Sequence, residues 1–192
     1  MAYPTVSAPY GFKPVNRVDG MPYAGATRQY QIDDGADIFY GDLVNLVAGK
    51  IFPFTGTDAG FPLGVFTGCS YTNSMSQPVQ AQYYPAGQAD GVAYVVVDDQ
   101  AAYQVAVTDA GSAVVSTTGI ASIGANIEVV TGTGNANTGN SGMSVLVGSE
   151  VVTGTLPIRV IDVVPATETA TGYPELIVKI NVSQFQRATG VV

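Results

Sequence analysis

The chain of 192 residues contains no histidine and no tryptophan, and its single cysteine is Cys69. Without histidine, Ser-His-Asp and Cys-His catalysis, histidine-ligated zinc and histidine acid–base chemistry are excluded. A lone cysteine cannot form an intramolecular disulfide bond, and no histidine or nearby cation activates this thiol. We therefore expect Cys69 to be a small buried apolar residue rather than a nucleophile.

Charged residues are also scarce, at 11% of the chain, whereas 46% of the residues are hydrophobic. Soluble domains average about 25% charged residues, and intrinsically disordered chains combine low hydrophobicity with high charge. Disorder is therefore excluded as a description of the whole chain. The sequence also lacks an uninterrupted apolar run of the length that a membrane-spanning helix needs.

Basic residues are absent from residues 51–158, a stretch that contains seven acidic residues, and the net charge of the chain is −8. A surface of this kind repels phosphate groups. We therefore expect neither a nucleic acid nor an anionic membrane as a partner. The acidic middle of the chain is expected to face solvent and to favour solubility.

Valine, threonine and tyrosine are abundant, glycine and proline punctuate the chain, and no apolar period of 3.6 residues is sustained. This pattern predicts an all-β fold, an antiparallel β-sandwich or barrel of short strands. Residues 92–97 and 101–107 are expected to form a hairpin through Asp98-Asp99. The expected strands are residues 28–32, 42–47, 51–54, 63–71, 79–84, 92–97, 101–107, 126–130, 143–147, 158–164 and 176–182.

Residues 1–27 contain four prolines and are predicted to form an extended N-terminal arm, because each proline fixes its own φ and favours extended geometry in the residue before it. The β-rich domain then covers residues 28–192, with a subdomain boundary expected near residues 106–127. An arm of this kind either covers its own domain or reaches a neighbour, and both alternatives stay open. The residues expected to contact a partner are Tyr3, Tyr10, Phe12, Arg17, Tyr23 and Arg28.

The sequence contains fragments of several chemical motifs, but none of them is complete. The glycine-rich segment 131–142 lacks the spacing of a dinucleotide fingerprint and no helix is expected after it, and Gly49-Lys50 is not followed by the Ser or Thr of a P-loop. Asp33, Asp34 and Asp37 offer oxygen atoms for calcium, but they do not match an EF-hand loop and are also typical of a turn. We expect no catalytic residues, no metal and no cofactor.

Several segments together resemble head decoration (cement) proteins and other virion structural proteins of tailed bacteriophages. They are residues 8–15 (APYGFKPV), 38–44 (IFYGDLV), 62–68 (PLGVFTG), Asp98-Asp99 with 103–105 (YQV), 137–142 (NTGNSG) and 178–182 (VKINV). The resemblance implies a β-rich module, commonly a trimer, that is made in the host cytoplasm and binds the outer surface of the assembled capsid. Its partner is then the major capsid protein.

On this interpretation the chain is not an enzyme, and it stabilises the capsid by bridging coat subunits. Residues 2–27 would contact the coat protein or a sister subunit, by strand addition, with Arg17 and Arg28 pairing with coat carboxylates. Two alternatives stay open. The chain is another virion component, such as a tail-tube or head-fibre protein, or it is a carbohydrate-binding module.

Overall fold

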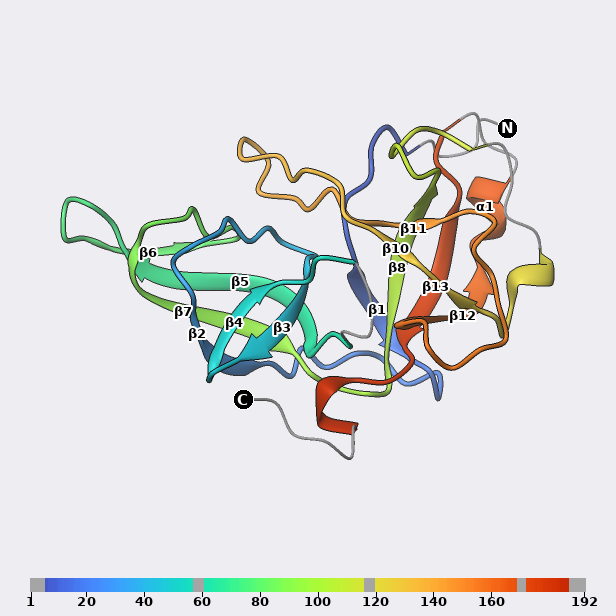
Figure 1. Cartoon of the computed structure of the whole chain (residues 1–192), viewed down its shortest axis with the longest axis horizontal. Coiled ribbons are helices and arrows are strands. Elements are labelled where there is room, and N and C mark those ends of the chain that lie inside the picture. Colours follow the sequence, from blue (N-terminus) through green and yellow to red (C-terminus); the bar gives the residue numbers. More distant parts are fainter. Residues whose placement is uncertain (1–5, 57–60, 116–119, 169–171, 187–192) are drawn as a thin grey trace.

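The computed structural model describes residues 6–56, 61–115, 120–168 and 172–186. Strands make up most of its regular structure and form two barrel-like sheets, which we call the first and the second barrel and which lie side by side (Figure 1). The prediction of an all-β fold is therefore confirmed. The strands are β1 (Lys13–Arg17), β2 (Arg28–Ile32), β3 (Leu43–Val47), β4 (Lys50–Pro53), β5 (Gly64–Thr72), β6 (Pro78–Ala81), β7 (Ala89–Val96), β8 (Ala101–Thr108), β9 (Asn126–Ile127), β10 (Val129–Val130), β11 (Ser144–Leu146), β12 (Ile158–Val163) and β13 (Glu175–Ile180). The short helices are η1 (Ile120–Ser122), α1 (Pro165–Glu168) and η2 (Gln184–Gln186).

The first barrel is built from β2 to β7. Its strand order is β3-β4-β2-β7-β5, and the ring closes because β3 also pairs with β5, while β6 adds to the edge of β5. The pairs are antiparallel except for β2 with β4. The inward side chains form a core that includes Cys69, as the sequence predicts, and burial raises the pKa of its thiol to about 12. The core residues are Ile32, Ile38, Val44, Ile51, Leu63, Phe66, Cys69, Tyr84, Ala93 and Val95.

The second barrel is built from β8 to β13. Its order is β10-β11-β8-β13-β12-β9, and the two end strands β9 and β10 lie close together because only Glu128 separates them along the chain, which gives the sheet a barrel-like shape. Alternate residues of β8 and β13 belong to its buried core, which explains the apolar period of two in both strands. The N-terminal strand β1 pairs with the first half of β8, and β11 pairs in parallel with its end.

The chain changes barrels twice, because β1 belongs to the second barrel, β2 to β7 form the first, and β8 returns to the second. The predicted hairpin of residues 92–97 and 101–107 is therefore wrong. The edges of β7 are occupied by β2 and β5, and β8 pairs with β1, β11 and β13. The second change of sheet falls at residues 97–100.

The two barrels share a packed joint. Leu43, Phe54 and Val65 of the first barrel belong to the same buried cluster as the interior of the second. The side-chain amide of Gln184 in η2 accepts a hydrogen bond from the Leu46 amide at 2.7 Å and donates one to the Leu46 carbonyl at 3.2 Å. Apolar contact and paired backbone groups therefore hold the barrels together.

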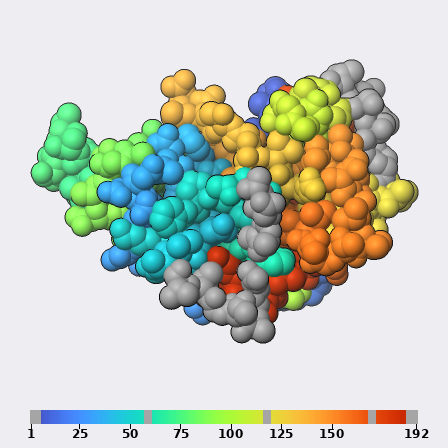
Figure 2. Space-filling view, in the orientation of Figure 1, coloured from blue at the N-terminus to red at the C-terminus, as the bar shows by residue number. Residues whose placement is uncertain are grey.

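Two loops stand out from this body. Figure 2 shows the turn between β5 and β6 at one end of the molecule and the segment around residues 132–142 rising from the joint. The first is a tight turn in which the side-chain oxygen of Asn73 accepts hydrogen bonds from the amides of Met75 and Gln77. The second is the glycine-rich segment that the sequence predicts to be a loop.

Candidate functional site

The described part of the arm before β1 packs against its own domain. The amide of Gly11 donates to the Met143 carbonyl at 3.2 Å, and the amide of Phe12 donates to the Gly41 carbonyl at 2.8 Å. The Phe12 ring is fully buried and lies edge-on to Tyr103, with ring centroids 6.5 Å apart. Phe12 is therefore a core residue of its own chain, and the expectation that it contacts a partner is corrected.

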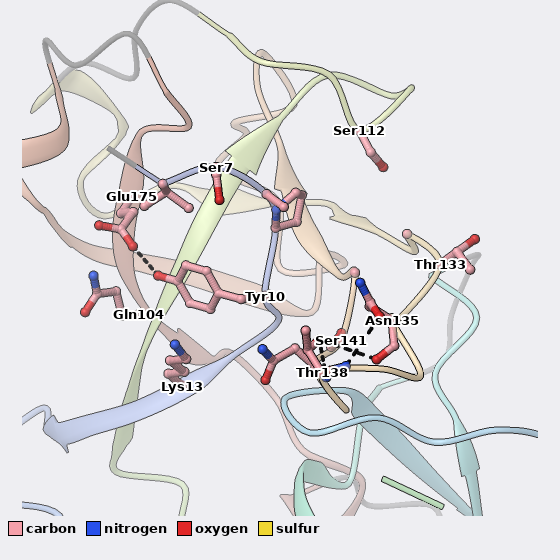
Figure 3. A pocket seen from close by; sticks show the side chains of 16 residues that line it. Ser7, Tyr10, Lys13, Gln104, Ser112, Thr133, Asn135, Thr138, Ser141 and Glu175 are labelled. Carbon is pink, nitrogen blue, oxygen red and sulfur yellow. Dashed lines mark hydrogen bonds between the residues drawn. The ribbon is translucent and has the colours of Figure 1, made fainter. Parts of the chain in front are cut away.

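Tyr10 ties the same segment to the second barrel. Its hydroxyl donates a short hydrogen bond to Oε1 of Glu175, a buried carboxylate at the start of β13, and the ammonium of Lys13 lies 4.2 Å from the centre of its ring (Figure 3). Burial, the hydrogen bond to Glu175 and its negative charge raise the pKa of the Tyr10 hydroxyl above its usual range, while Gln104 opposes the rise. Tyr10 is thus half-buried and bonded within its own chain.

A pocket of about 760 Å³ opens between this segment and the glycine-rich loop. Figure 3 shows Tyr10 crossing the pocket, with Glu175 and Gln104 on one side and Asn135, Thr138 and Ser141 on the other. Most lining side chains are hydroxyls and amides, together with one cation and one carboxylate. The lining residues are Val6, Ser7, Ala8, Pro9, Tyr10, Lys13, Gln104, Ser112, Gly132, Thr133, Asn135, Thr138, Asn140, Ser141, Gly142 and Glu175.

The glycines beside the pocket allow backbones to approach closely. A Cβ on Gly142 would lie 2.8 Å from the Gly132 carbonyl carbon and 2.7 Å from that of Thr133. The two stems of the loop are therefore in close contact at Gly132 and Gly142, which have no side chains. Gly11 has a φ of +78°, and a Cβ there would lie 2.5 Å from the Cβ of Ser141. Sequence reasoning identified the glycines but could not assign them this packing role.

β1 and the turn after it form the exposed part of the arm. Val15 is the extra residue of a β-bulge, since Pro14 pairs with Tyr103 and Asn16 with Ala102. Val15, Val18 and Met21 have exposed fractions of 41%, 38% and 61%. Among the described residues, no strand pairs with the outer edge of β1. On that edge Asn16 forms an isolated β-bridge with Pro22. We call Val15, Val18 and Met21 the β1 surface.

The remaining predicted contact residues differ in their availability. Arg17 already binds Asp98 at 2.8 Å and Asp19 at 3.4 Å, so its charge is compensated within the chain. The Tyr23 hydroxyl donates to the Ala26 carbonyl at 2.7 Å. Arg28 begins β2 and is exposed, without an ion pair among the described residues. Tyr3 lies outside the residues that the structure describes.

A second exposed apolar group lies beside β9 and β12, and in the strand order β8 and β13 stand between β12 and β1. Asn126 and Val151 pair through two backbone hydrogen bonds, which brings the loop before β12 alongside the segment that follows η1. The exposed fraction of Val152 is 96%. We call this group, which consists of Ile120, Ile123, Val151 and Val152, the η1 surface.

The acidic turn that offers calcium ligands uses its carboxylates locally. Asp33 accepts a hydrogen bond from the Gly35 amide at 3.0 Å and lies 3.9 Å from the ammonium of Lys50, and Asp37 accepts one from the Ala86 amide at 2.8 Å. Asp34 is exposed beside them. Within the described ranges, no three His, Cys, Asp or Glu side chains are placed to hold a metal ion.

Asp42 is a buried carboxylate at the joint between the barrels. Its Oδ2 accepts a hydrogen bond from the Phe39 amide at 2.7 Å. Burial raises the pKa of Asp42 to about 6, and hydrogen bonds from Ser141 and from the Phe39 backbone oppose the rise. The sequence places Asp42 at the start of the expected strand 42–47, and nothing in its local pattern reveals that its carboxyl is buried.

Comparison with protein-family models, with curated proteins and with solved structures returns no match for this chain. In the part of the chain that the structure describes, no helix has the length and apolar character needed to cross a membrane. The functional interpretation therefore depends on the residues and surfaces described above.

Proposed function

We propose that this chain is a structural protein of a tailed-bacteriophage virion that binds the outer surface of the assembled capsid and stabilises it by bridging coat subunits. The resemblance of its sequence segments to head decoration proteins suggests this role. Its partner would be the major capsid protein, and its place would be the capsid exterior.

Two separate exposed apolar surfaces on one small chain are the observation that best supports the proposal. The β1 surface lies beside β8, and the η1 surface lies beside β9 and β12. A protein that bridges two subunits needs at least two contact surfaces, and exposed apolar groups of this kind are typical of protein interfaces.

The outer edge of β1 offers a way to attach. An exposed strand edge presents unpaired amide and carbonyl groups, to which a strand of the coat protein or of a sister subunit can add. Arg28, without an ion pair in the described part of the chain, is available to a coat carboxylate, whereas Arg17 would first have to leave Asp98.

Trimer formation would strengthen such a contact. When three copies are linked, the second and third contacts become intramolecular, which raises the overall affinity by roughly 10²–10⁴. A trimer has a mass of three times 19.8 kDa, which sedimentation of the purified chain measures directly. If the purified chain sediments as a monomer at micromolar concentration, the proposed trimer is wrong.

Co-sedimentation with phage heads that were assembled without this chain tests the proposal. The test variant replaces the β1 surface by polar residues of similar shape, Val15→Thr, Val18→Thr and Met21→Gln. Its matched control is Met75→Gln, because Met75 is 77% exposed at the far turn between β5 and β6. We expect the wild-type chain and the control to sediment with heads and the triple variant to remain largely in the supernatant.

Deletion of residues 1–24 is not a suitable test, because it removes Phe12 from the core. Loss of a buried phenylalanine side chain costs about 3–5 kcal/mol, so a loss of binding could not be told from a loss of folding.

If the triple variant binds heads as well as the wild type, the β1 surface has no role in attachment. Electron microscopy of labelled virions that places the chain on the tail or on head fibres would contradict binding to the capsid surface.

A further inference from the structure

The pocket beneath the glycine-rich loop is not needed for capsid binding, yet its lining is chemically selective. Its volume of about 760 Å³ lies within the range of ligand sites, which is about 300–1,000 Å³. Five hydroxyl side chains and three amide side chains line it, around the ring of Tyr10 (Figure 3). The hydroxyl residues are Ser7, Ser112, Thr133, Thr138 and Ser141, and the amide residues are Gln104, Asn135 and Asn140.

Many of these polar groups are available to a ligand. Asn135 uses its side-chain oxygen to accept hydrogen bonds from the amides of Asn137 and Thr138, and Asn140 uses its oxygen to accept one from Gln82. The NH₂ groups of both asparagines have no partner among the described residues. The same is true of the hydroxyls of Ser7, Ser112 and Thr133. A ligand would therefore meet several unpaired donors and acceptors.

The charge of the pocket argues against phosphate ligands. Lys13 is its single cation, and the ammonium already lies 4.2 Å from the centre of the Tyr10 ring. Glu175 contributes a negative charge nearby, and the whole chain carries a net charge of −8. A phosphate or sulfate group would therefore meet little attraction and long-range repulsion.

The many hydroxyl and amide groups of the pocket argue against a purely apolar ligand. Its apolar side chains are the short Val6, Ala8 and Pro9 of the arm. A saccharide fits better, because its hydroxyls both donate and accept hydrogen bonds and its C–H groups can contact an aromatic ring. Amide and hydroxyl side chains beside a tyrosine ring match both properties.

The walls are also held in place before any ligand arrives. Tyr10 is fixed by Glu175, the Tyr173 amide donates to the Val6 carbonyl at 3.3 Å, and the loop stems meet at Gly132 and Gly142. Thus a ligand need not order the site, which reduces the entropic cost of binding.

We infer that this pocket binds a short neutral saccharide, held by the free NH₂ groups of Asn135 and Asn140 and by the ring of Tyr10. This binding site does not depend on the proposed capsid function, and its test uses the purified chain without heads.

A glycan array followed by titration calorimetry tests the inference. The pocket variants are Asn135→Asp and Asn140→Asp, which keep the accepting oxygen of each loop bond and remove the NH₂ donor. The matched control is Asn137→Asp, which makes the same chemical change on the same loop, outside the pocket lining. We expect a neutral saccharide to bind the wild type and the control equally, and each pocket variant to bind about tenfold more weakly or worse.

A second measurement locates the ligand. In NMR spectra of the labelled chain, saccharide should shift the signals of Tyr10 and of residues 132–142, and inorganic phosphate should not. No saccharide binding tighter than a dissociation constant of about 1 mM would overturn the inference. It would also be overturned by equal binding to the wild type and both pocket variants, or by a response to phosphate alone. If heads lose affinity for the pocket variants while no saccharide binds, the pocket belongs to a protein contact and the inference fails.

Discussion

The hydroxyl of Tyr10 donates a hydrogen bond to Oε1 of Glu175, across a sequence separation of 165 residues. This contact joins the N-terminal segment to β13, the strand between β8 and β12 in the second barrel. Residues 6–14 therefore lie against the second barrel, whereas the side chains of Val15, Val18 and Met21 are exposed. The arm therefore has a first part that stabilises its own chain and a second part that is available to a partner.

Substitution of Tyr10 by phenylalanine should destabilise the protein. Tyr10→Phe removes the hydrogen-bond donor of a buried carboxylate, which costs about 1–3 kcal/mol when the carboxylate is left unpaired. Denaturant unfolding measures the loss. Tyr94→Phe is the control, because the Tyr94 hydroxyl makes no hydrogen bond within the described residues, and it should change the free energy of unfolding by less than about 0.5 kcal/mol. Equal effects of the two variants would show that the Tyr10–Glu175 contact contributes nothing.

Substitution of Gly142 by alanine should displace the loop that covers the pocket. Its Cβ would lie within 2.8 Å of carbonyl carbons in the facing stem, so either the stems separate or the backbone shifts. Overpacking of this kind costs about 1–3 kcal/mol. Gly154→Ala is the control, because no atom lies within 4 Å of its added Cβ. Thermal unfolding of both variants checks the prediction, and a melting temperature of Gly142→Ala equal to that of the wild type would contradict it.

The pH dependence of stability should carry a contribution from Asp42. Its pKa is raised from 3.8 to about 6 in the folded chain, so the folded state favours the protonated carboxyl. The stabilising effect is complete below about pH 4, is lost as the pH rises to about 6, and stays lost at higher pH. The shift corresponds to at most about 3 kcal/mol.

Comparison of Asp42→Asn with the wild type isolates this contribution. The amide still accepts the Phe39 hydrogen bond but does not ionise, so the variant should gain stability relative to the wild type between pH 4 and pH 7. Urea unfolding at several pH values gives the difference. A difference between Asp42→Asn and the wild type that does not change with pH would refute the assignment.

The sequence predicted most strands because local pattern and tertiary structure agree there. β13, for example, alternates Leu176, Val178 and Ile180 toward the core, and this period of two is visible in the sequence. Cys69 was predicted to be a small buried apolar residue because no histidine or nearby cation activates its thiol, and it is buried. These features depend on neighbours within a few residues.

Long-range pairing was not predictable in the same way. Asp98-Asp99 is typical of a turn, but it cannot reveal that β7 pairs with β2 and β5 rather than with β8. Phe12 was predicted to contact a partner because it lies in the proline-rich arm, whereas its ring is buried in the cluster that forms the core of the second barrel. The pocket was not predicted either, because its two walls come from residues 6–13 and 132–142, which have no common local pattern.

Thermal denaturation of phage heads assembled without this chain tests the central proposal most directly. If the chain binds the assembled shell and not its dissociated subunits, mass action stabilises the shell. Addition of the purified wild-type chain should then raise the melting temperature of the heads in a concentration-dependent way, and the Val15→Thr, Val18→Thr, Met21→Gln variant should raise it much less. An unchanged melting temperature at a saturating concentration of the wild-type chain would contradict the proposal that it is a capsid-stabilising protein.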